Sequence, residues 1–133
     1  MKENVKKWFI KAMEDLKVVE HEMVLLKNEI ATSAVCFHCQ QFVEKVLKAY
    51  LTIKNVDFGK THNLEFLLEL CRKQDRDFEQ IDTGNLTFYA VDVRYPDEFY
   101  IPSFEEAREC YEIAKKVKEF IERKLNIKIE ENL

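Results

Sequence analysis

The sequence is poor in the residues that turn a chain. It has two glycines and two prolines among 133 residues, and the scarcity of glycine leaves few places for the tight turns that β-hairpins need. With 47% hydrophobic and 35% charged residues, the composition favours helices. Acidic residues outnumber basic ones, 25 to 21, which argues against a broad electrostatic grip on nucleic acid and leaves room for a small basic patch.

Long hydrophobic runs are also missing. The N-terminal stretch MKENVKKWFIKAMEDLK is interrupted by charge every few residues, so it predicts neither a signal peptide nor a membrane span. We therefore expect a cytoplasmic protein with no membrane partner, whose four cysteines are reduced. Cys36 and Cys39 have the spacing of zinc ligands, but they fall on a predicted helix and two further ligands would be needed. We expect no metal and no cofactor.

Apolar residues recur at three- and four-residue steps along most of the chain, which is typical of amphipathic helices. The last helix is expected to begin after a capping box, in which the Ser103 hydroxyl and the Glu106 carboxylate accept from each other's backbone N–H. Gly84 weakens the pattern of the fourth helix. The pattern predicts helices over residues 2–28, 32–53, 61–73, 78–94 and from 103 onward.

These segments predict an all-α fold, an antiparallel up-and-down bundle of about five helices in which the third is a small cross-piece. The bundle is expected to form a single domain over residues 1–126, followed by a frayed tail over 127–133. Both prolines of the chain lie between the last two helices. Because proline interrupts a helix, residues 95–102 are predicted to form a non-helical elbow.

The elbow segment AVDVRYPDEFYIPSFEEA places an arginine among aromatic residues. Arg94 has two interpretations. It can cap carbonyls at the end of the fourth helix and pair with Asp92 or Asp97. It can instead hold a phosphate, with Tyr95 and Tyr100 stacking on a base. The residues alone leave both open.

Three motifs together resemble the HEPN family: CFHCQQFVEKVLKAYL in the second helix, THNLEFLLELC after it, and YAVDVRYPD before the last helix. The resemblance covers residues 8 to about 125. It implies a small helical bundle that is often a homodimer. It also implies a small nucleotidyltransferase as partner, in a toxin–antitoxin or nucleotide-related pair.

Many HEPN domains are metal-independent ribonucleases that carry an arginine followed, after four to six residues, by a histidine. Arg94 matches the arginine, but the places of the histidine are held by Phe99, Tyr100 and Ile101. Cleavage without metal needs an acid–base group near neutrality, which histidine supplies, whereas an unperturbed tyrosine titrates near pH 10. We therefore expect nucleotide or RNA binding with poor cleavage or none.

Two alternatives stay open. One is a ribonuclease that uses His38 or His62 in place of the missing histidine, and the other is a purely structural dimerisation module. The polar residues of the second helix are predicted to lie on a solvated or partner-facing strip that comprises Gln40, Gln41, Glu44 and Lys45.

Overall fold

The computed structural model describes residues 1–90 and 100–133. This part of the chain contains no strand and four α-helices, which confirms an all-α fold. The helices are α1 (Glu3–Met23), α2 (Thr32–Ile53), α3 (Leu64–Gln74) and α4 (Phe104–Leu125). Single 3-10 turns lie at Lys27–Glu29 (η1), Arg76–Gln80 (η2), Leu86–Tyr89 (η3) and Ile129–Asn132 (η5).

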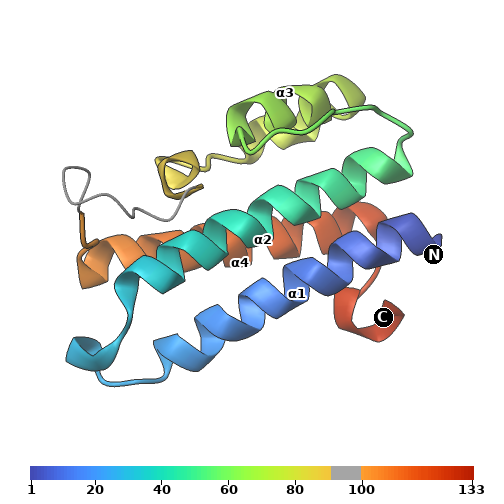
Figure 1. Cartoon of the computed structure of the whole chain (residues 1–133). Coiled ribbons are helices and arrows are strands. Elements are labelled where there is room, and N and C mark those ends of the chain that lie inside the picture. The colour runs from blue at the N-terminus through green and yellow to red at the C-terminus, as the bar shows by residue number, and fades with distance from the viewer. Residues whose placement is uncertain (91–99) are drawn as a thin grey trace.

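Helix α2 is the centre of a packed helical bundle. It contacts α1 along its length, α4 on another side, and α3 at the top in Figure 1. The chain reverses between α1 and α2, so these two helices are antiparallel. Helices α2 and α4 run in the same direction, because both begin at the same end of the bundle, toward which residues 75–90 return after α3 (Figure 1). The sequence predicted an antiparallel bundle, and this prediction is wrong for the pair α2 and α4.

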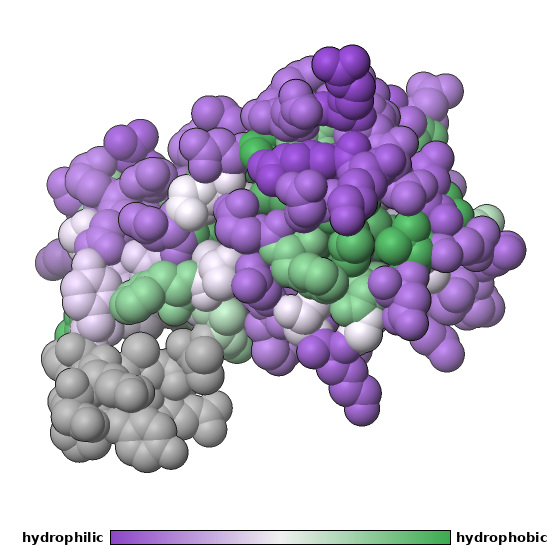
Figure 2. All heavy atoms as spheres, turned by 90° about the horizontal axis from the view of Figure 1, so that it is seen from above, coloured by the Kyte–Doolittle hydropathy of each residue, from purple (hydrophilic) through white to green (hydrophobic). Residues whose placement is uncertain are grey.

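The amphipathic stripes predicted from the sequence form the core. Apolar residues of all four helices are buried, because burying one stripe of each helix removes its apolar surface from water. The face seen in Figure 2 is largely hydrophilic, with a smaller area of hydrophobic residues. Fully buried large side chains include Phe9, Phe42, Leu47, Leu51, Leu64, Leu67, Leu68, Phe78 and Ile121.

The prediction of a fourth helix over residues 78–94 is wrong for residues 78–90, the part that the structure describes. Residues 76–90 contain only the two short turns η2 and η3. Gly84 adopts a left-handed conformation with φ +52°, and its N–H donates to the Asp82 carboxylate at 2.8 Å, so the helix cannot pass through this point. The segment is held instead by Phe78, whose ring centroid lies 4.7 Å from that of Tyr50 and 4.8 Å from that of Phe120.

The predicted capping box is confirmed at the start of α4. The Ser103 hydroxyl accepts from the Glu106 N–H, and the Glu106 carboxylate accepts from the Ser103 N–H, both at 3.1 Å. Residues 100–102 are not helical. The rest of the predicted elbow, residues 95–99, lies outside the described residues.

The two ends of the long helices differ from the sequence-based boundaries. Helix α1 ends at Met23 rather than near residue 28. Helix α4 ends at Leu125, and the left-handed conformation of the next residue, Asn126 (φ 53°), turns the chain back. The sequence predicted fraying beyond this point, whereas Ile129 is fully buried and its N–H donates to the Glu122 carboxylate at 2.9 Å. Among the described residues, no helix combines the length and hydropathy needed to span a membrane.

Candidate functional site

Two tyrosines, one on each side of Arg94 in the sequence, contact one carboxylate at the N-terminus of α4. The Tyr89 hydroxyl donates to Glu106 Oε2 at 2.9 Å, and the Tyr100 hydroxyl lies 2.6 Å from both carboxylate oxygens. Helix α4 presents Glu106 here because this residue is also the third residue of the capping box. One side chain thus caps the helix and holds the residues before and after the segment that contains Arg94.

The same hydrogen bonds shift the pKa values of the three groups in opposite directions. Donation by Tyr100, by the Ser103 N–H and by Tyr89 lowers the pKa of the Glu106 carboxyl to about 2. The bond to Glu106 raises the pKa of Tyr100. Burial, and then the bond to Glu106, raises the pKa of Tyr89. Both tyrosines therefore stay protonated donors near neutral pH, and Tyr100 moves further from the range in which a hydroxyl acts as a base.

We call the contacts of Glu106 with Tyr89 and Tyr100 the clamp. Exposed aromatic rings lie beside it. Phe88 is 64% exposed and Tyr100 is 44% exposed. Their centroids lie 6.1 Å apart with the rings nearly perpendicular, and Phe88 makes a second edge-to-face contact with Tyr89 at 5.3 Å. Such contacts fix the orientation of the rings while leaving part of their area accessible to a stacking partner.

Only part of the site predicted from the sequence can be placed. Tyr100 lies beside Glu106, as described above. Arg94, Tyr95, Asp92 and Asp97 lie outside the described residues, so both interpretations of Arg94 stay predictions. His38 and His62 belong to two polar clusters elsewhere on the bundle.

The first cluster joins α1 to α2. Asp15 of α1 is buried, and its two carboxylate oxygens take different partners from α2. Oδ1 lies 2.7 Å from Nδ1 of His38, and Oδ2 lies 2.6 Å from Nζ of Lys45. Because the buried carboxylate contacts a cation and a ring N–H, its charge is compensated.

The second cluster joins α2 to the connection before α3. Glu44 is buried, and its Oε2 accepts from Nζ of the buried Lys48 at 3.0 Å. Its Oε1 lies 2.9 Å from Nδ1 of His62 and accepts from the Gln40 amide at 3.1 Å. Gln40 also donates to the backbone carbonyl of His62 at 3.2 Å. The ring and the backbone of His62 are thus both fastened to α2, although the ring itself is 70% exposed.

The predicted solvated or partner-facing strip on α2 is therefore wrong for Gln40 and Glu44, which are buried. Sequence reasoning placed them outside because polar residues on an amphipathic helix normally face water. The signal that was missed is their spacing. Gln40, Glu44 and Lys48 follow one another at four-residue intervals and so share one side of α2, where hydrogen bonds among them replace those to water.

A metal centre has no basis in the described residues. They contain no group of three or more His, Cys, Asp or Glu side chains that could hold an ion. The four cysteines are free and buried. Burial raises the pKa of the Cys71 thiol to about 12 and also raises that of Cys39, which disfavours the thiolate that binds metals.

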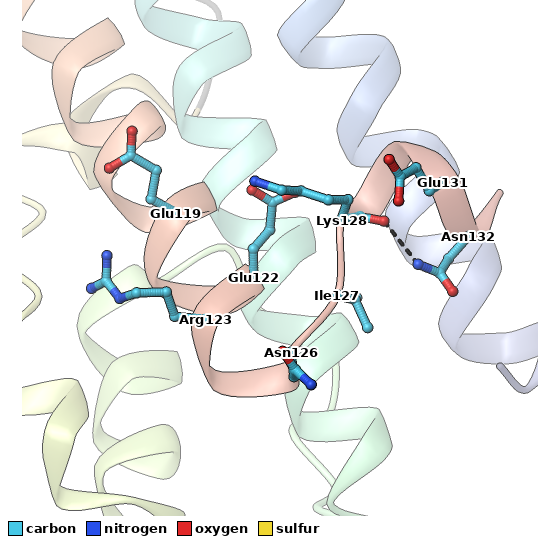
Figure 3. Close-up of a pocket in the computed structure, with 8 residues that line it drawn as sticks. All are labelled: Glu119, Glu122, Arg123, Asn126, Ile127, Lys128, Glu131 and Asn132. Atoms are coloured by element: carbon cyan, nitrogen blue, oxygen red, sulfur yellow. Dashed lines mark hydrogen bonds between the residues drawn. The ribbon is translucent and has the colours of Figure 1, made fainter.

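An open groove of about 770 Å³ lies at the other end of α4. Figure 3 shows Glu119 and Arg123 on the helix, with their side chains directed away from Lys128 and Glu131 of the C-terminal segment. Both acidic and basic side chains line the groove. The Glu122 carboxylate already accepts hydrogen bonds from Lys118 and from the Ile129 N–H. The groove results from the return of the C-terminal segment to the bundle, and it does not gather groups of one charge.

The described residues define an all-helical bundle in which two tyrosines before its last long helix contact the first turn of that helix. A family model, that of the HEPN domain, matches residues 5–124. The chain belongs to the HEPN domain family, as its motifs indicated. This family is linked to RNA binding, to ribonuclease activity and to nucleotidyltransferase partners. The searches of curated proteins and of solved structures found no match to the chain.

Proposed function

We propose that this HEPN domain binds a nucleotide or RNA at the elbow before α4. Arg94 holds a phosphate, because a guanidinium presents a planar fork of donors that suits phosphate oxygens. Tyr95 and Tyr100 stack on a base. The observation that carries the proposal is the exposed ring pair Phe88 and Tyr100, which lies on the two sides of the segment containing Arg94.

The stacking role of Tyr100 is supported by its fixed position. The bond to Glu106 uses the hydroxyl and leaves much of the ring accessible. Base–aromatic stacking is worth about 1–3 kcal/mol per base and needs no particular base. The elbow therefore suits single-stranded RNA or a free nucleotide better than a duplex, whose bases are already stacked.

We propose binding rather than cleavage. The family motif lacks its histidine in this chain, and Tyr100, one of the residues in its place, has a raised pKa that makes it a poor base. His38 and His62 contact Asp15 and Glu44 through Nδ1, and neither of them contacts the tyrosines beside the elbow. The family's link to nucleotidyltransferases further supports action beside such a partner, in a toxin–antitoxin type pair.

A second proposal, homodimerisation, is favoured by apolar side chains at the same end of the bundle. Val24 and Leu26 lie on the α1–α2 connection and are exposed, as is Ile101 before α4. Lys27 Nζ lies 4.8 Å from the ring centroid of Phe104, which brings this connection beside the start of α4. Apolar groups gathered at one end favour burial in an interface with a second copy.

Alanine substitution of exposed phenylalanines tests the binding proposal. Phe88→Ala should weaken binding of a fluorescein-labelled hexauridylate roughly 5-fold or more, because one stacking surface is lost. Phe66→Ala is the matched control, since Phe66 is also exposed (46%) but lies on α3. Equal affinities of the wild type, Phe88→Ala and Phe66→Ala in fluorescence anisotropy would contradict the proposal.

A further inference from the structure

Two of the three histidines in the chain are held in the same unusual way. A buried carboxylate contacts Nδ1 of the imidazole with one oxygen and the ammonium of a lysine on α2 with the other. In one pair Asp15 holds His38 and Lys45, and in the second Glu44 holds His62 and Lys48. The third histidine, His21, is exposed on the last turn of α1.

This arrangement leaves Nε2 of both rings available. Each carboxylate also accepts a hydrogen bond from a lysine ammonium, so it is ionised and Nδ1 of the imidazole is the donor in each contact. The other ring nitrogen, Nε2, takes no part in these contacts. Within residues 1–90 and 100–133, Nε2 of neither ring has a hydrogen-bond partner. The ring of His62 in particular is mostly in solvent, so burying apolar surface does not explain why its position is so tightly defined.

The two pairs lie on neighbouring sides of one helix. His38, Gln41, Lys45 and Lys48 follow at intervals of three and four residues, which places them in a row along α2. Gln41 links the pairs, because its amide donates at 2.7 Å to Gln40, which itself contacts both Glu44 and His62. His38 and Lys45 are partly accessible, whereas Lys48 is buried.

Charge along this row favours an anion. Each carboxylate is balanced by one lysine, so it does not leave the row with a net negative charge, and the partly accessible ammonium of Lys45 has further N–H donors. A phosphate group has several acceptor oxygens and forms strong hydrogen bonds with such cations. The carboxylates are buried beneath the donors, where they orient them, as acidic groups behind a histidine do in other ligand sites.

We propose that His38, Gln41, Lys45 and His62 form a phosphate-binding row on α2, distinct from the elbow and from the family motif around Arg94. The proposal rests on the proposed function in one respect, since the phosphate is taken to belong to the nucleotide or RNA that the elbow binds. The row supplies contacts for phosphate groups and no base recognition. Lys48 acts from beneath, through Glu44.

The three histidines allow a direct test by nitrogen-15 NMR of the imidazole side chains. The wild type is titrated with inorganic phosphate, with ADP and with hexauridylate. We expect saturable shifts of the His38 and His62 Nε2 resonances and none at His21. Saturation by ADP assigns the row to a free nucleotide, and saturation by hexauridylate alone assigns it to an RNA backbone.

The same titration of Arg94→Ala separates this proposal from the previous one. If Arg94→Ala binds with unchanged affinity and still shows the chemical-shift changes at His38 and His62, the result would support the phosphate-binding row and contradict binding at the elbow. Arg94-dependent binding without shifts at either histidine would overturn the row and leave the elbow standing. Absence of binding to the wild type, or equal shifts at His21, would overturn the row as well.

Affinity measurements provide the second test. His62→Gln should preserve the fold, because its ring is largely exposed, and should weaken the preferred ligand at least 3-fold, as should His38→Gln. His21→Gln is the matched control and should bind like the wild type. Circular dichroism checks that each variant folds. Wild-type affinity in both folded variants, His38→Gln and His62→Gln, would overturn the proposal.

Discussion

The Tyr100 hydroxyl lies 2.6 Å from both carboxylate oxygens of Glu106. Together with the bond from Tyr89, this contact brings residues from both sides of Arg94 to the first turn of α4. The two ends of the segment that contains Arg94 are thereby held at one point. Because Tyr89 and Tyr100 are already fixed by Glu106, a ligand that contacts them loses less conformational entropy on binding, which favours affinity.

The clamp predicts a stability contribution that acid removes. The pKa of the Glu106 carboxyl is about 2 in the folded protein and 4.5 without these contacts. The ionised carboxylate therefore stabilises the fold at higher pH, and this contribution is lost as the pH falls from about 4.5 toward 2. Glu106→Gln should therefore have a lower free energy of unfolding than the wild type near neutral pH. The difference between the two free energies should become smaller as the pH falls from about 4.5 toward 2.

Urea unfolding at several pH values measures this difference. Glu105→Gln serves as a control, because it removes a neighbouring carboxylate from the first turn of α4 without touching the tyrosines. A difference between wild type and Glu106→Gln that stays constant down to about pH 2 would show that the tyrosine bonds do not stabilise the ionised carboxylate.

The buried pair Glu44 and Lys48 predicts an asymmetric response to mutation. Glu44→Ala leaves a buried ammonium without its partner and should destabilise the fold by about 3–5 kcal/mol. The double variant Glu44→Leu, Lys48→Met should recover most of the loss, since it removes both charges. Chemical denaturation gives both free energies. The exposed pair of Glu105 with Arg108 provides the contrast, and Glu105→Ala should cost less than about 1 kcal/mol.

Two phenylalanines before the elbow should separate stability from binding. Phe78 is fully buried against Tyr50 and Phe120, so Phe78→Ala should cost about 3–5 kcal/mol of unfolding free energy. Phe88 is exposed, and Phe88→Ala should change stability by no more than about 0.5 kcal/mol while weakening ligand binding. A large loss of unfolding free energy in Phe88→Ala would contradict this prediction and show that Phe88 stabilises the fold.

The apolar end of the bundle predicts a dimer that charge disrupts. The wild type should have the mass of a homodimer by light scattering at micromolar concentration, and Leu26→Glu should shift it toward the monomer. Ile10→Glu is a control, because Ile10 is also exposed but lies in the middle of α1. A monomeric wild type would contradict this prediction.

Much of the fold could be predicted from the sequence, because long amphipathic stripes and a capping box are local signals. The stripes of α1, α2 and α4 and the Ser103–Glu106 box needed no tertiary information. Residues 78–90 were mistaken for a helix because their apolar spacing suits one, whereas the left-handed Gly84 and the packing of Phe78 decide against it. The return of the C-terminal segment depends on one left-handed residue, Asn126.

The candidate site could be predicted only in part. An arginine among aromatics is visible in the sequence, and Tyr100 lies at the clamp. The partner of Tyr100 was not foreseen, because Glu106 already had a local role in the capping box. The clusters around Asp15 and Glu44 depend on contacts between residues 18 to 30 positions apart, which no local pattern encodes.

The most direct test of the account is the binding of labelled hexauridylate to the wild type and to Arg94→Ala in the presence of EDTA, with the RNA examined on a gel afterwards. We expect saturable binding by the wild type, affinity lower by roughly 10-fold or more in Arg94→Ala, the usual worth of a charge-assisted hydrogen bond, and intact RNA in both samples. Equal affinities would contradict the phosphate-binding role of Arg94, and cleavage by the wild type that Arg94→Ala abolishes would contradict binding without cleavage.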